Sequence, residues 1–306
     1  MLRTPLRESS WLSTIAGGTV RLKLETLQPT FSYKIRGAFN TILRLIEEHP
    51  DQRQPLVTAS AGNHGSALAR AARCGRFPLI VYASAAAPKV KLDGMREEGA
   101  DVRLCRDYDE AELTAKQLGT SGDALFISPY AHPDVIAGAG TVGLEIVDEW
   151  PEVDTIVVAV GGGGLIGGIA LAAREAKPRV SVVGVEAEAS SPFTAALAAG
   201  RIIEIDVRPT LADGLAGNLD PDTPTFAIVR SSVDRIVQVS EANLRSAVAG
   251  VVRHEHLIAE GAGAAGIAGL LAGGLDLRGQ NVAVVLSGAN IDPGVLRDAT
   301  GWSATD

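Results

Sequence analysis

Short apolar runs alternate along the chain with segments in which apolar positions recur every three or four residues. Such runs are typical of buried strands, and the recurring positions are typical of helices with one buried face. Strands are expected at residues 20–24, 56–58, 77–82, 101–104, 124–127, 155–160, 180–185 and 281–286, and helices at 63–74, 88–98, 109–118 and 165–177. The alternation predicts an α/β fold in which parallel sheets are covered by helices on both faces.

The alternation falls into two series, and a chain of 306 residues is long enough for one large or two ordinary domains. We expect a smaller domain at residues 54–134 and a larger one built from residues 1–53 and 135–306. No linker-like change in composition marks the boundaries, so only the order of strands and helices defines them.

A further helix is expected to begin near Lys34, in the segment Ser-Tyr-Lys-Ile-Arg-Gly-Ala-Phe-Asn at residues 32–40. Apolar or small residues follow at helical spacing, namely Ala38, Ile42, Leu45 and Ile46. Lys34 therefore lies at a helix start, behind Ser32 as a capping residue, where a positive charge is disfavoured. A neutral amine is what Schiff-base chemistry needs. A lone lysine is more often a solvated surface residue, so this interpretation depends on other motifs.

Four adjacent glycines, Gly161 to Gly164, follow the apolar run 155–160 and open the helix at 165–177. Glycines allow successive backbone N–H groups to face one point, and a helix N-terminus adds partial positive charge. The segment therefore predicts a phosphate cradle. Gly162, Gly164 and Gly167 also match G-x-G-x-x-G, and Glu186 follows at the spacing of a ribose-binding acid, so a dinucleotide remains an alternative.

Two other strand ends carry polar residues. Ser60-Ala61-Gly62-Asn63-His64-Gly65 joins an expected strand to an expected helix, and the N–H groups of such a junction suit a carboxylate. Asn63 can donate to an oxyanion, whereas His64 is expected to contribute its backbone amide rather than its imidazole. Ser287 follows the strand 281–286, where ligands bind in doubly wound sheets.

Bulk properties exclude several function classes. The net charge is -8 and no basic run is present, so we expect no nucleic-acid partner. No apolar stretch is long enough to cross a bilayer, and residues 1–13 lack the apolar core of a signal peptide, so we expect no membrane association. Cys74 and Cys105 lack metal-ligand spacing, and we expect no metal site and a reduced, cytoplasmic setting.

Together the motifs resemble the serine/threonine dehydratase (threonine ammonia-lyase) family of pyridoxal-phosphate enzymes of fold type II, which also contains the serine racemases. The resemblance runs over nearly the whole chain. Its landmarks are residues 4–6, 22–29, 32–38, 60–65, 134–138, 161–165, 212–214 and 287–288. It implies two domains, each an open, mostly parallel twisted sheet flanked by helices, with the active site in the cleft between them. It also implies a homodimer.

The resemblance also implies residue roles. Lys34 would carry the Schiff base to pyridoxal 5'-phosphate, Asn63 would meet the ring oxygen, and Ser287 would meet the ring nitrogen. The remaining cofactor contacts would come from Tyr33, Gly161, Gly162, Gly163, Gly164, Leu165 and Gly214. The substrate carboxylate would bind to Ser60, Ala61, Gly62, Asn63 and His64. Because a serine at the ring nitrogen is neutral, the ring would be a weaker electron sink than in folds that place an aspartate there.

The chain departs from the family at a few positions. Phe31 stands where a glycine is usual, and Tyr33 where a phenylalanine is usual. A bulky Phe31 is expected to reshape the pocket, which leaves the preferred amino acid open. The acid Glu186 is present, but Pro192 stands six residues on where racemases have an aspartate, so the divalent-metal site of that branch is not expected.

We therefore expect a pyridoxal-phosphate-dependent ammonia-lyase that converts L-threonine, L-serine or a similar small β-hydroxy amino acid to a 2-oxo acid and ammonia. Alternatives of the same fold are an amino-acid racemase and a hydroxyaspartate dehydratase. Alternatives of other classes are a nicotinamide-dependent oxidoreductase, which rests on the glycine fingerprint, and a non-catalytic pyridoxal-binding protein, which rests on Phe31 crowding the site.

Overall fold

The computed structural model describes residues 1–302, which fold into two compact units. The smaller unit contains residues 34–138 together with Met1, and the larger contains Leu2–Tyr33 and the described residues from Ala139 onward. These units differ from the domains expected above, because residues 34–53 and 135–138 belong to the smaller one. Helix α2 (Lys34–Glu48) packs there against α3 (Asn63–Gly75), which explains the difference.

The larger unit is built on a six-stranded sheet in the order β1-β2-β10-β7-β8-β9. Its strands are β1 (Leu6–Glu8), β2 (Thr19–Leu24), β7 (Thr155–Ala159), β8 (Ser181–Ala187), β9 (Arg235–Val239) and β10 (Asn281–Leu286). Only β1 is antiparallel to its neighbour, and every other pair is parallel. The carboxyl ends of the parallel strands therefore share one edge, which is where open α/β sheets bind ligands.

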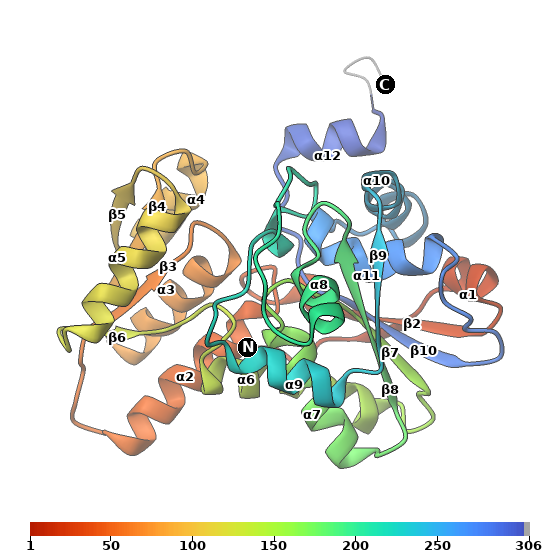
Figure 1. Cartoon of the computed structure of the whole chain (residues 1–306), viewed down its shortest axis with the longest axis horizontal. Helices are drawn as coiled ribbons and strands as arrows, with labels where there is room; N and C mark the ends of the chain where they lie inside the picture. The colour runs from red at the N-terminus through yellow and green to blue at the C-terminus, as the bar shows by residue number, and fades with distance from the viewer. Residues whose placement is uncertain (303–306) are drawn as a thin grey trace. The chain divides into compact units, whose positions relative to one another are not determined.

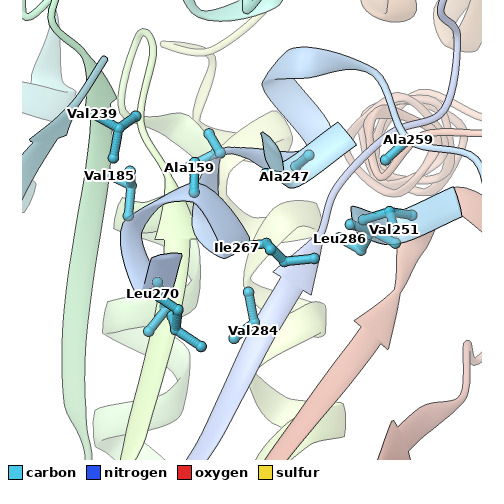
Figure 2. Packing of buried hydrophobic residues seen from close by; sticks show 14 of the residues in the cluster. Ala159, Val185, Val239, Ala247, Val251, Ala259, Ile267, Leu270, Val284 and Leu286 are labelled. Carbon is cyan, nitrogen blue, oxygen red and sulfur yellow. The ribbon is translucent and has the colours of Figure 1, made fainter. Parts of the chain in front are cut away.

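Both faces of this sheet are buried, which explains why its strands read as continuous apolar runs rather than alternating ones. In β7, Val157 and Ala159 belong to one core cluster, while Ile156 and Val158 belong to the other. Figure 2 shows the first cluster, in which residues of β7, β8 and β10 lie around Ile267 and Leu270.

Both of those residues belong to α11 (Gly261–Leu271), a helix built of glycine, alanine and a few larger apolar residues. A Cβ on Gly266 would lie 2.9 Å from Val284, and one on Gly269 would lie 2.8 Å from Val185. The glycines thus let α11 lie directly against the strands. The run of alanine, glycine and leucine at residues 264–275 predicts a closely packed internal helix, and α11 begins three residues and ends four residues before these bounds. The close approach to the strands accounts for its composition.

The other helices of the larger unit are α1 (Ser10–Ala16), α6 (Pro133–Glu149), α7 (Gly164–Ala176), α8 (Pro192–Ala199), α9 (Pro224–Ser232), α10 (Glu241–Gly250) and α12 (Pro293–Thr300), with 3-10 turns at Glu25–Leu27 and Asp213–Leu215 and a π-helix at Val251–Glu255 (Figure 1). The first turn of α6 belongs to the smaller unit. The sequence pattern did not predict β1, β9, α1, α6, α8, α9, α10 or α12, because these elements are short or weakly periodic.

The smaller unit holds a four-stranded sheet in the order β5-β4-β3-β6, and all its pairs are parallel. Its elements besides α2 and α3 are β3 (Leu56–Ala59), β4 (Leu79–Ser84), α4 (Lys89–Glu97), β5 (Asp101–Cys105), α5 (Tyr108–Thr120) and β6 (Leu125–Phe126). One core cluster joins α2, α3 and α4 to this sheet, and a second joins α5 to its other face. Both mostly parallel sheets are therefore flanked by helices, which confirms the predicted fold class.

Within residues 1–302, no helix combines the length and the apolar character that a membrane span requires.

Candidate active site

Lys34 is the first residue of α2, at the helix start that the sequence predicted. Its Nζ donates a hydrogen bond of 2.7 Å to the carbonyl oxygen of Pro129, which follows β6 in the same unit. The side chain is half-buried. The amine therefore donates to a backbone carbonyl of its own unit from the start of the helix. Sequence reasoning missed Pro129, because a backbone carbonyl has no residue-type signal.

The start of α2 is held by close contact with the beginning of α6. A Cβ on Gly37 would lie 2.9 Å from Val135, and one on Gly138 would lie 2.5 Å from the carbonyl oxygen of Arg36. The Asn40 side chain donates to the carbonyl of Asp134 at 2.8 Å. Two glycines and one amide therefore fix the backbone that carries Lys34.

The loop from Ser60 to Gly65 connects β3 to α3, as expected. The Ser60 hydroxyl accepts N–H groups from Gly62 at 3.3 Å and from Gly65 at 3.1 Å. A hydroxyl has two acceptor positions and one proton, so Ser60 can still donate to a group outside the loop. Nothing lies within 4 Å of a Cβ built on Gly62, which leaves open space beside the first turn of α3.

Asn63 and His64 are the first two residues of α3. The His64 ring is buried, and neither imidazole nitrogen makes a hydrogen bond. Burial, followed by the charge of Lys34, lowers the pKa of His64 to about 3. The Ile127 carbonyl acts in the opposite direction but lacks hydrogen-bond geometry, so burial dominates. His64 is therefore neutral at working pH. That its backbone rather than its imidazole contacts a ligand stays a prediction.

In the larger unit, β7 leads into the glycine loop and then into α7. Gly163 is the N-cap of α7, with φ at +84°, and no side chain caps this helix. A Cβ on Gly163 would lie 2.5 Å from the Phe193 ring and 3.0 Å from Thr225. Glycine is thus required by conformation and by space. The first turn of α7 carries no acidic residue, so its positive end is suited to an anion.

Gly214 lies beside this loop, although almost fifty residues separate it from Gly164. A Cβ on Gly161 would lie 3.0 Å from the Cα of Leu215 and 3.5 Å from the carbonyl oxygen of Gly214. The Leu215 amide donates to the carbonyl of Ala212 and so closes the turn. Leu165 is buried in the core beneath the loop. The fold therefore brings the predicted residues 161–165 and 214 together.

Ser287 follows β10, which pairs with β7, so it comes out at the same sheet edge as the glycine loop. Its carbonyl accepts the Tyr33 amide at 3.0 Å, and its amide donates to the Gly263 carbonyl at 3.3 Å. Ser32 and Gly288 form an antiparallel bridge. Residues 32 and 33, just before Lys34, are therefore hydrogen-bonded to the turn that carries Ser287.

Phe31 has φ at +54°, and its carbonyl accepts the Ala289 amide at 2.9 Å. A bulky residue in this left-handed region costs about 1–2 kcal/mol, which explains why glycine is usual at this position. The Phe31 side chain is 57% exposed. Its expected effect on the pocket stays a prediction.

Glu186 lies near the carboxyl end of β8, where a dinucleotide enzyme would bind ribose. Here its side chain is fully buried and accepts hydrogen bonds from the Phe193 amide at 2.8 Å and from the Thr194 amide at 2.9 Å. The carboxylate is therefore engaged by α8 and not available to a ribose. This removes the main support for the nicotinamide-dependent alternative.

The chain is similar to known proteins along nearly its whole length. A family model described as pyridoxal-phosphate dependent enzyme matches residues 1–288. The L-threonine ammonia-lyase of Thermotoga maritima is 42% identical over 96% of this chain and 73% of its own length. The processed threonine deaminase isoform 2 of Solanum lycopersicum superposes with a TM-score of 0.91 at 31% identity, over 99% of this chain and 88% of that one. Maize serine racemase superposes with a TM-score of 0.89 at 30% identity, over 98% of this chain and 92% of that one.

Proposed function

The chain belongs to the serine/threonine dehydratase family of pyridoxal-phosphate-dependent enzymes, and we propose that it releases ammonia from L-threonine, L-serine or a similar small β-hydroxy amino acid. The observation that carries the proposal is Lys34 at the first residue of α2, with its Nζ 2.7 Å from the Pro129 carbonyl oxygen. The net reaction yields a 2-oxo acid and ammonia.

The residues present fit the cofactor. Its phosphate needs several N–H donors and no competing carboxylate, and the Gly161–Gly164 loop at the uncapped start of α7 supplies this environment. A side chain at Gly163 would meet Phe193, so the space at the loop depends on glycine. When bound, pyridoxal phosphate supplies the electron-withdrawing ring that makes the substrate α-proton acidic.

Lys34 is the residue we assign to the covalent link and, once the amino acid has displaced it, to removal of the α-proton. A neutral amine accepts that proton at Nζ, and the resulting ammonium can donate to the Pro129 carbonyl, its partner in this structure.

The first turn of α3 is the site we propose for the substrate carboxylate, through the N–H groups near Asn63 and His64 and through the Ser60 hydroxyl. The Gly62 and Gly65 amides donate to the Ser60 oxygen, and this leaves the hydroxyl proton to donate to the substrate carboxylate. The neutral, buried His64 ring adds no charge and excludes water beneath the loop.

Replacement of Ser287 with alanine is expected to weaken cofactor binding about fivefold, since one neutral hydrogen bond contributes on the order of 1 kcal/mol. The dissociation constant is measured by cofactor fluorescence. The control is Ser181→Ala at the start of β8, two strands from β10 in the same sheet and away from the glycine loop. An unchanged constant for Ser287→Ala would remove Ser287 as the partner of the ring nitrogen.

The function itself is tested with the purified holoenzyme and a panel of L-serine, L-threonine and β-hydroxyaspartate. We expect a visible absorption band that borohydride bleaches, and ammonia release that is fastest with one of the two neutral amino acids. A bleachable band without ammonia release would identify a binding protein instead. Fastest turnover of hydroxyaspartate would favour the dicarboxylate dehydratase.

We expect elimination rather than racemisation, because racemisation needs a proton donor on the cofactor face opposite the lysine. In the racemases a serine two residues before the loop asparagine supplies it, and here that residue is Ala61, which has no exchangeable proton. With L-serine, pyruvate should therefore form faster than D-serine. Ala61→Ser should raise the ratio of D-serine to pyruvate, with Ala59→Ser as the control inside β3. D-serine forming faster in the unaltered enzyme would identify a racemase.

The homodimer and the cytoplasmic location expected from the sequence, and the Schiff base at Lys34, stay predictions. Sedimentation of the purified chain checks the first, and mass spectrometry after borohydride reduction locates the cofactor-bearing residue.

A further inference from the structure

The buried carboxylate of Glu186 forms an anchor for α8. One oxygen accepts the Phe193 amide at 2.8 Å, and the other accepts the Thr194 amide at 2.9 Å and the Thr194 hydroxyl at 2.6 Å. These donors stand in the first turn of α8, whose positive end also favours the carboxylate. Burial raises the pKa of Glu186, although the donors from Thr194 and Phe193 oppose the shift.

Helix α8, which Glu186 holds, contacts the glycine loop through Phe193. Phe193 is fully buried, and its ring lies against Gly163, where a Cβ would stand 2.5 Å from Cζ. The amide of the same Phe193 is one of the groups bound by Glu186. Moving the first turn of α8 would therefore move the ring that supports the loop.

The sheet provides a second connection. The Val160 amide, just before the glycine loop, donates to the carbonyl of Val185 at 2.8 Å, and Val185 directly precedes Glu186. The carboxylate and the loop are thus linked through both the backbone of β8 and the ring on α8, within one compact unit.

We propose that Glu186 is a positioning residue for the phosphate-binding loop: it fixes the first turn of α8, and the Phe193 ring of α8 then holds Gly163 in the left-handed conformation that opens α7. The inference rests on the proposed function, because the anion at the loop is taken to be the cofactor phosphate. It assigns to Glu186 a role through hydrogen bonds within the protein.

A metal at Glu186 would be a different role for the same residue. A hard cation prefers several oxygen ligands, and Pro192, six residues on, has none in its side chain. No group of three His, Cys, Asp or Glu side chains suited to a metal occurs in the described part of the chain. The three donors from α8 account for the carboxylate without a cation.

The test compares cofactor retention by Glu186→Ala holoenzyme with that of Asp234→Ala. Asp234 also accepts hydrogen bonds from main chain and side chain, at 2.7 Å from the Val182 amide and 2.6 Å from Arg174, but it does so at the opposite end of β8. Removing the Asp234 carboxylate should destabilise the same sheet and leave the conformation of the glycine loop unchanged. Readouts are the cofactor dissociation constant, the ³¹P resonance of the bound phosphate, and urea unfolding.

For Glu186→Ala we expect at least a tenfold weaker cofactor affinity and a shifted ³¹P resonance, since hydrogen bonds to a charged group are stronger than those between neutral groups. Asp234→Ala should lose stability while both cofactor readouts stay unchanged. Thr194→Val, which removes only the hydroxyl donor, provides a milder variant with the same direction of change. Phe193→Leu should reproduce the effect and add little to it in the double variant.

Unchanged affinity and resonance in Glu186→Ala and Thr194→Val would overturn the inference. Equal loss of affinity in Asp234→Ala would do the same, because general destabilisation would then suffice. Loss of activity on chelation, restored by magnesium, would assign Glu186 to a metal instead. Failure of the proposed function is distinguishable, because the unaltered protein would then hold no pyridoxal phosphate or release no ammonia.

Discussion

Replacing Lys34 with alanine is expected to abolish ammonia release, with turnover reduced by at least about a thousandfold. General-base catalysis by a positioned side chain contributes about 10²–10⁴, and the covalent link would be lost as well. Nζ of Lys34 lies 2.7 Å from the carbonyl oxygen of Pro129 in the smaller unit. We propose that from this position the amine forms the covalent link and removes the α-proton. Steady-state ammonia release and the borohydride-sensitive absorption band measure the two losses separately.

The control for this variant is Lys89→Ala. Lys89 is likewise the first residue of a helix, α4, in the same unit, but its side chain is 88% exposed and paired with Asp93. It should keep normal turnover and a normal absorption band. If Lys34→Ala retained a bleachable band and ordinary ammonia release, the assignment of the central lysine would be wrong.

Gly163→Ala is expected to have the second largest effect, the loss of stable cofactor binding. An alanine at φ +84° costs about 1–2 kcal/mol in backbone strain. Its Cβ would also meet the Phe193 ring at 2.5 Å and Thr225 at 3.0 Å, and such overpacking costs about 1–3 kcal/mol more. The loop must therefore shift, and its N–H groups would no longer face one point. We expect the cofactor dissociation constant to rise about a hundredfold.

Gly200→Ala separates the two contributions. Gly200 has a similar φ of +69° and caps the end of α8, but nothing lies within 4 Å of its missing Cβ. It should lose about 1–2 kcal/mol of unfolding free energy and keep its cofactor affinity. Comparable loss of affinity in both variants would show that strain, rather than the geometry of the loop, limits binding.

The motifs could be found in the sequence because each depends on local chemistry. A lysine behind a serine at a helix start, four glycines between a strand and a helix, and a polar loop at residues 60–65 have recognisable residue types at short spacing. The strongly apolar strands β7 and β10 were also predicted, since strands buried on both faces are apolar at every position. The family resemblance then assigned roles that these patterns alone left open.

Other features depend on contacts between residues far apart in the chain. Glu186 has the spacing of a ribose-binding acid, and only its contacts with α8 show that it is a structural anchor. Likewise, no local pattern shows that Pro129 would offer its carbonyl to Lys34.

The sequence by itself determined the α/β class, the order of the main elements and the candidate residues, because periodicity and glycine clusters act within a few residues. Only the tertiary structure decided that α2 belongs with the smaller unit and that Gly214 lies against the glycine loop. It also decided that His64 is buried and neutral. The physical reason is that packing, desolvation and hydrogen bonding depend on neighbours brought together by the fold, whose identity is not encoded near the residue itself.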